Sequence, residues 1–155
     1  MDTPAAAAAA LRWGFEAAIA LQARSITCVT STFEGWPLDN GTLLLALATW
    51  LHLPQRRLVL LAADYRDMGV CFPRFDAWRR SWVHAVPASR CPPDLALGLH
   101  EALFDDSRVS VQLFDAVTGR GRASLEPRQR LLLAQQTDAV LQRSEAAWPV
   151  KTLGI

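Results

Sequence analysis

The sequence predicts a single α/β domain of three layers, in which helices cover both faces of a mixed, mostly parallel sheet. Three observations predict this fold class. Runs with helical spacing alternate along the chain with short runs typical of strands. The run RLVLLAAD (57–64) is apolar without alternation, as expected for a strand covered on both faces of a parallel sheet. The length of 155 residues suits one domain with its own core.

The first half of the chain predicts helices and strands in strict alternation. Thr3 is a suitable N-cap and Pro4 a suitable first helical residue, so an alanine-rich helix begins there, with residues 1–9 left open to fraying. The runs SITCVTST and RLVLLAAD predict two strands, and the helix between them ends before Pro54, because proline cannot continue a helix. These elements are helix 4–24, strand 25–32, helix 42–53, strand 57–64 and a third helix, 73–82.

The second half predicts one more strand, a helix, a hairpin and a closing helix. VHAVPA is short and apolar, and DLALGLHEALFDD has the composition of a helix. RVSVQLFD and GRASLE alternate polar and apolar residues on either side of a glycine-containing turn, as hairpin strands do. Pro127 can start the last helix and Pro149 ends it, leaving 149–155 as a tail. These elements are strand 83–88, helix 94–106, strands 108–115 and 121–126, and helix 127–148.

Composition argues against several classes of function. Hydrophobic residues make up 51% of the chain and charged residues 20%, the reverse of the balance in disordered proteins. The 16 basic and 15 acidic residues give a formal net charge of +1, whereas nucleic-acid binders usually carry a clear basic excess. We therefore expect no nucleic-acid partner.

Cysteine usage and the apolar runs bear on compartment and membrane. Cys28, Cys71 and Cys91 are odd in number and too widely spaced for a disulfide framework or a CxxC metal site, which favours a reducing cytoplasm. The most apolar segment, TLLLALATWL, is shorter than the roughly 18 residues of a membrane span. We expect no membrane association, no metal and no cofactor.

The segment CFPRFDAWRRSW (71–82) interleaves aromatic residues with arginines, a mixture that can bind phosphate or fold as an ordinary amphipathic helix. Phe75, Trp78 and Trp82 stand at i, i+3 and i+7, which places them on one stripe that we expect to face the core. Arg79 lies at the edge of this stripe. It can hold an anion, form a surface salt bridge, lie over a tryptophan face or reach into an interface.

A ligand site in an open α/β sheet is expected where the parallel strands end, at their carboxyl termini. The predicted strand ends are 31–32, 64–65 and 87–89. Asp64 is the charged residue among them. It is a candidate ligand-binding residue, and its alternative role is to cap the turn that closes the strand.

The run ARSITCVTSTFEGWPLDNGTLLLALATWLHLPQRRLVLLAADY resembles one half of a phospholipase D-superfamily domain, and TDAVLQRSEAAW resembles that family's C-terminal helix. The resemblance spans about residues 10–150 and rests on patterns of apolar residues. It implies the signature His-x-Lys, four residues and Asp, with the histidine as nucleophile. The nearest remnant is HEALFDD, in which His100 is present, Ala102 occupies the lysine position and Asp106 lies one position short.

This resemblance, without its catalytic signature, implies a non-catalytic domain that acts as a binding or assembly module. Because the family's active unit combines two such halves, we expect a homodimer with the first or third helix near the interface. A phosphate-containing molecule is the expected ligand, with Asp64, Arg79, His100 and Asp106 as candidate binding residues. The alternative is a hydrolase or phosphodiesterase that uses His100, Asp106 and the strand ends on a phosphate-containing substrate.

Overall fold

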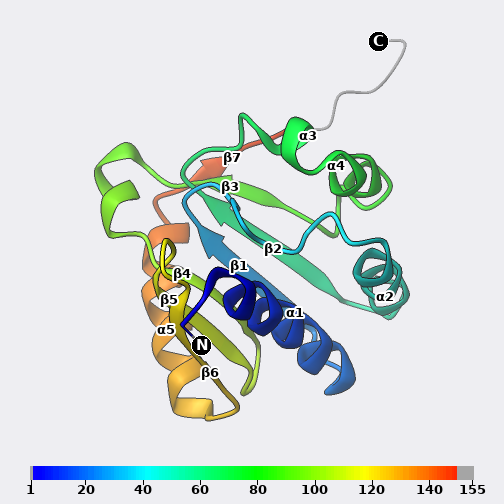
Figure 1. The fold of residues 1–155 in the computed structure, drawn as a ribbon. Coiled ribbons are helices and arrows are strands. Elements are labelled where there is room, and N and C mark those ends of the chain that lie inside the picture. The colour runs from blue at the N-terminus through cyan, green and yellow to red at the C-terminus, as the bar shows by residue number, and fades with distance from the viewer. Residues whose placement is uncertain (1, 150–155) are drawn as a thin grey trace.

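The structure of the chain is a computed structural model that describes residues 2–149. Its described residues form one mixed sheet of seven strands in the order β6-β5-β4-β1-β2-β3-β7 (Figure 1). The strands are β1 (Ser25–Thr30), β2 (Arg57–Ala62), β3 (Ala88–Arg90), β4 (Glu101–Asp105), β5 (Ser110–Asp115), β6 (Arg120–Ser124) and β7 (Glu145–Ala146).

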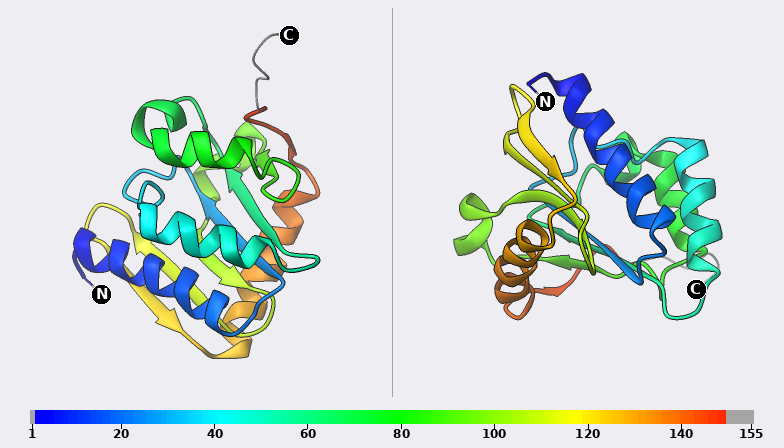
Figure 2. Two further views of the ribbon diagram at one scale, coloured as in Figure 1. Left: turned by 90° about the vertical axis from the view of Figure 1, so that its right-hand side faces the viewer. Right: turned by 90° about the horizontal axis from the view of Figure 1, so that it is seen from below.

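Helices lie on both faces of the sheet, but unequally. Four helices lie on one face, whereas one α-helix and a short 3₁₀ helix lie on the other (Figures 1 and 2). The α/β class is therefore confirmed. The first group is α1 (Pro4–Ala20), α2 (Gly41–Leu51), α3 (Met68–Cys71) and α4 (Pro73–Arg80), and the second is η1 (Pro93–Gly98) and α5 (Pro127–Leu141).

Helix α1 packs on the sheet through Leu11, Phe15 and Ala18. The Thr3 hydroxyl accepts a hydrogen bond from the Ala6 N–H at 3.0 Å and Pro4 follows as the first helical residue, so the predicted start is confirmed. A Cβ atom at Gly14 would lie 2.8 Å from the side chain of Leu103. A larger residue here would therefore have to displace the Leu103 side chain of β4. The helix ends at Ala20, before the predicted Arg24.

The prediction of a mostly parallel sheet is wrong. Two ladders, β1–β2 and β2–β3, are parallel, whereas β1–β4, β4–β5, β5–β6 and β3–β7 are antiparallel. The cause is that β4 and β7 lie in segments for which the sequence predicts helices. The hairpin predicted from GRASLE and RVSVQLFD is confirmed as β5 and β6.

Residues 94–106 do not form the predicted helix. Only the 3₁₀ helix η1 forms there, and β4 follows in the centre of the sheet. Leu103 packs into the core on the α1 side, and Ala102 and Phe104 pack on the α5 side. Burial on both faces of the sheet therefore outweighs the helical propensity of Ala, Leu and Glu in this segment.

Two more boundaries differ from the prediction. The third strand is Ala88–Arg90 rather than 83–88, because the N–H groups of Ala85 and Val86 donate to the Trp82 carbonyl, at 2.8 and 2.9 Å, and hold this segment in turns. The preceding residues still pair with β2 through single bonds, since the Leu58 N–H donates to the Ala85 carbonyl at 2.9 Å. The last helix ends at Leu141 rather than at 148, and the chain then adds β7 beside β3.

The predicted aromatic stripe of helix α4 is confirmed. Phe75 is fully buried, and Trp78 and Trp82 are partly buried against the same core. The ring centroids of Phe75 and Trp78 lie 5.5 Å apart. Among the described residues, no helix combines the length and apolar character that a membrane crossing requires.

Candidate functional site

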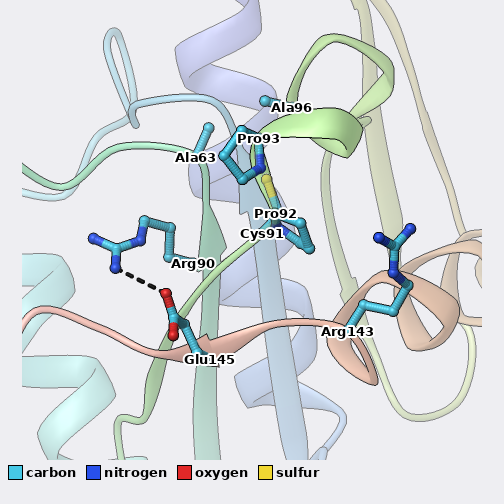
Figure 3. Close-up of a pocket in the computed structure, with 8 residues that line it drawn as sticks. All are labelled: Ala63, Arg90, Cys91, Pro92, Pro93, Ala96, Arg143 and Glu145. Atoms are coloured by element: carbon cyan, nitrogen blue, oxygen red, sulfur yellow. Dashed lines mark hydrogen bonds and ion pairs between the residues drawn. The ribbon is translucent and has the colours of Figure 1, made fainter.

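Two adjoining cavities lie at the carboxyl ends of β2 and β3. The first has a volume of about 580 Å³ and is lined by Arg90, Arg143 and Glu145 around an apolar floor that includes Cys91 and Pro93 (Figure 3). The second, of about 440 Å³, shares Ala63 and Arg90 with the first and adds Asp64, Tyr65, Arg66 and Trp148. Because the two cavities share these residues, we treat them as one feature, the arginine groove.

The two central arginines come from different elements. Arg90 ends β3 directly opposite Glu145 of β7, and its Nη2 lies 3.0 Å from the Glu145 Oε1 atom. Arg143 lies in the turn between α5 and β7, and its Nη2 lies 3.0 Å from the Asp94 Oδ2 atom. In Figure 3 the two guanidiniums stand on opposite sides of Cys91 and Pro92. The close pairing of β7 with β3 therefore assembles the groove.

The two ion pairs of the groove contribute little to the stability of the fold. The side chains of Arg90 and Arg143 are 52% and 55% exposed, and those of Glu145 and Asp94 are more exposed still. Exposed ion pairs of this kind stabilise a fold by about 0–1 kcal/mol each. A guanidinium has five N–H donors, and each of these two uses one nitrogen for its carboxylate. The remaining donors can reach a ligand oxygen.

Asp64 lies in the groove at the end of β2, as predicted, but it acts as a turn residue. Its Oδ1 atom accepts the backbone N–H of Arg66 at 2.8 Å, and its Oδ2 atom lies 2.7 Å from the Arg66 Nη2 atom. These hydrogen bonds with Arg66 lower the pKa of Asp64 below its ordinary value. The carboxylate therefore stays ionised and is a poor general base.

Arg79 lies behind the groove rather than in it. Its side chain is buried, its Nε donates to the Val86 carbonyl at 3.1 Å, and its Nη1 donates to the Trp148 carbonyl at 2.7 Å. The guanidinium carbon also lies 4.3 Å from the centroid of the Trp148 ring. Burial lowers the pKa of Arg79. Of the roles that the sequence leaves open, Arg79 stacks on a tryptophan, and it thereby positions one wall of the groove.

Tyr65 supports the same wall from the sheet side. Its ring stacks on that of Trp148 with centroids 5.8 Å apart, and its hydroxyl donates to the Ser89 carbonyl at 2.6 Å. Burial raises the pKa of Tyr65 well above its ordinary value. The phenol is therefore a neutral donor at physiological pH.

His100 and Asp106 lie at opposite ends of β4. Five strand residues separate them, which corresponds to about 20 Å between their Cα atoms. The His100 Nδ1 atom lies 3.5 Å from the Gln112 Nε2 atom, and an Asp106 carboxylate oxygen accepts the backbone N–H of Arg24 at 3.3 Å. The structure therefore does not bring the predicted remnant together, and neither residue lines the groove.

Sequence reasoning missed Arg90, Arg143 and Glu145. For Arg90 a signal was available, because it lies one residue after the predicted strand end at 87–89. Glu145 and Arg143 carried no such signal, since the apolar spacing before Trp148 continues the pattern of the last helix.

The groove offers hydrogen-bond donors rather than a reactive group. Cys91 is buried in its floor, and burial raises the pKa of this thiol, which keeps it protonated. Within residues 2–149, no three His, Cys, Asp or Glu side chains gather as metal ligands would. Compared with known proteins, the chain matches no family model, no curated protein and no solved structure.

Proposed function

We propose that the chain is a non-catalytic, phospholipase D-like module that binds a phosphate-containing ligand in the arginine groove. The observation that carries this proposal is the pair of guanidiniums, Arg90 and Arg143, on either side of an apolar floor. Guanidiniums bind phosphate oxygens through two parallel hydrogen bonds. The proposal includes the cytoplasmic setting expected from the sequence, in keeping with three cysteines that form no disulfide.

A phosphate can compete with the carboxylates that now contact these arginines. Each carboxylate supplies one charge from an exposed position, where the pairing stabilises little. A phosphate carries up to two charges and several acceptor oxygens, so it can accept from the donors that either guanidinium has free. The apolar floor can then cover the uncharged part of the ligand.

Binding is better supported than hydrolysis. A phosphodiesterase needs a nucleophile and a proton-transfer group close together. In the groove Cys91 is held as a thiol and Asp64 is engaged by Arg66, while His100 and Asp106 lie at opposite ends of β4. These observations favour a module that holds its ligand without transforming it.

Calorimetric titration with pyrophosphate tests the binding. We expect saturable binding that Arg90→Gln and Arg143→Gln each weaken by at least about tenfold, because each removes a charged hydrogen bond of about 1.5–3 kcal/mol. Arg80→Gln is a matched control, since Arg80 is 53% exposed and also pairs with a carboxylate, Asp76 at 3.2 Å, on α4. It should leave the affinity unchanged.

Two outcomes would contradict this proposal. One is a titration with pyrophosphate that gives no saturable heat, and the other is binding by the two groove variants as tight as that of the Arg80→Gln control. Phosphodiesterase activity that His100→Ala abolishes would instead favour the hydrolase alternative. We expect the rate of phosphodiester hydrolysis to equal the uncatalysed background for both the unaltered chain and His100→Ala.

We also propose that the module is a homodimer joined through helices α1 and α2. A cavity of about 550 Å³ between them is lined by side chains without charge, among them Ile19, Leu53 and Leu45, of which Leu45 is 70% exposed. An uncharged face of this kind suits a second copy of itself, because no unpaired charge is buried when the copies meet. The tryptophans of α4 pack into the core, so α1 is the better supported of the two helices expected at the interface.

Light scattering at micromolar concentration tests this pairing. The unaltered chain should have the mass of a dimer, and Leu45→Lys should have that of a monomer, because two ammonium groups would be buried at the twofold axis. Leu97→Lys is the control, since Leu97 is fully exposed on η1, on the other face of the sheet. A monomeric unaltered chain would rule out the dimer.

A further inference from the structure

A third cavity opens between α5 and the sheet, with a volume of about 340 Å³. We call it the α5 cavity. The residues that matter for its chemistry come from β1, β4 and α5, and none of them lines the arginine groove. They are Thr27, Phe104, Arg130, Thr137, Asp138 and Leu141. The carboxylate of Asp138 is exposed, and it lies about two helical turns beyond Arg130 on α5.

Arg130 brings a hydrogen-bond donor without a partner to this cavity. Its Nε atom is buried and has no hydrogen-bond partner among the described residues, and its Nη1 atom reaches only the Asp105 carbonyl, at 3.4 Å. Buried polar groups in folded proteins nearly always have a partner, because an unmade hydrogen bond costs free energy. This donor is therefore available to an acceptor from outside the chain, water or a ligand.

The nearby carboxylate of Asp105 does not fill that role. One of its oxygens accepts three backbone N–H groups of the turn that follows β4, at 2.8–2.9 Å. Asp105 is 1% exposed, so its carboxylate is fixed in this turn. The Asp105 carboxylate therefore does not accept a hydrogen bond from the Arg130 side chain.

The other walls of the α5 cavity indicate the kind of ligand. Thr27 and Thr137 both line the cavity, and they are only 8% and 3% exposed. Their hydroxyl groups are polar groups on a largely buried wall. Phe104 and Leu141 add apolar surface. Ligand sites commonly combine such an apolar wall with a few fixed polar groups, and this volume is at the lower end of their range.

We propose that the α5 cavity binds a small organic anion, with its acidic group at Arg130 and its apolar body against Phe104 and Leu141. The acidic group is a carboxylate or a phosphate, since both accept from a guanidinium N–H. This site is separate from the arginine groove. The proposal therefore does not depend on whether that groove binds phosphate.

The test follows the Nε–Hε signal of Arg130 by nuclear magnetic resonance, with the signal assigned by its loss in Arg130→Lys. The probes are benzoate and phenyl phosphate, which share an apolar ring and differ in the acidic group, and benzyl alcohol, which lacks the charge. We expect a saturable shift with at least one acid in the millimolar range and a smaller or no shift with the alcohol. Benzoate alone would identify a carboxylate site, and phenyl phosphate alone a phosphate site.

Arg130→Lys keeps the positive charge but removes the Nε donor, so the affinity for the acid should fall about tenfold, as followed by the Thr137 backbone amide. Arg128→Lys is the control on the same helix, because Arg128 is exposed and does not line the cavity. An Arg130 signal that neither acid shifts would overturn the proposal in the unaltered chain, even if a variant failed to fold. So would equal binding of the acids and the alcohol, or equal affinity in Arg130→Lys.

Discussion

Arg79 shows how one buried cation can hold two segments that are far apart in sequence. Its guanidinium connects the carbonyls of Val86 and Trp148 and covers the Trp148 ring. The spacing of CFPRFDAWRRSW predicts the aromatic stripe and places Arg79 at its edge. It could not identify the partner, because Trp148 comes to α4 only when the last helix ends early and β7 joins the sheet.

Arg79→Ala should therefore destabilise the fold by about 2–4 kcal/mol, since it leaves two carbonyls without their donor and removes a cation–π contact. Urea unfolding measures this change. The control Arg80→Ala should cost less than about 1 kcal/mol, because the Arg80–Asp76 pair is exposed. Equal stability of the two variants would contradict the bridging role of Arg79.

Tyr65 gives the wall of the groove a measurable pH dependence. It is the chain's only tyrosine, and burial raises its pKa above the ordinary 10.0. A raised pKa means that the folded state favours the protonated phenol. The stability that this contributes is complete below pH 10.0 and is lost above it, because the unfolded chain ionises first.

The near-ultraviolet absorbance of phenolate follows this ionisation directly. In the folded chain the midpoint should lie above pH 10.0, and unfolding in guanidinium should return it to that value. A midpoint at the ordinary value in the folded chain would mean that the phenol is open to solvent and does not support Trp148.

At the scale of the elements, local signals predicted much of the N-terminal half. The cap at Thr3, the stop at Pro54 and the continuous apolar run of β2 are each encoded by neighbouring residues. All three elements end later in the prediction than in the structure, because the last residues of a helix or strand carry no strong signal of their own.

The strands β4 and β7 could not be predicted in this way. The residues EALFD of β4 have high helical propensity, and only their position between β1 and β5 makes them a strand. β7 has two residues and depends on β3 for its hydrogen bonds. The arginine groove requires β7, which depends on long-range pairing, so Arg143 and Glu145 were missed while Asp64, at the end of a local strand, was found.

At the scale of the whole molecule, the two faces of the sheet differ in what they offer. The thick layer of α1, α2 and α4 includes the uncharged cavity proposed for pairing, whereas the thin layer of η1 and α5 leaves room for the α5 cavity (Figure 2). The arginine groove lies at the sheet edge formed by β3 and β7. The proposed dimer therefore uses none of the residues of the groove, and both copies can bind a ligand.

The central claim is that a phosphate replaces carboxylates at the guanidiniums of the arginine groove. Calorimetric titration of Glu145→Gln with pyrophosphate tests it most directly, because this substitution removes the group that competes for Arg90 and leaves Arg90 in place. We predict binding up to about fivefold tighter than that of the unaltered chain, which corresponds to an exposed ion pair of up to about 1 kcal/mol. Unchanged or weaker binding would contradict the account, because Glu145 would then not compete with the ligand.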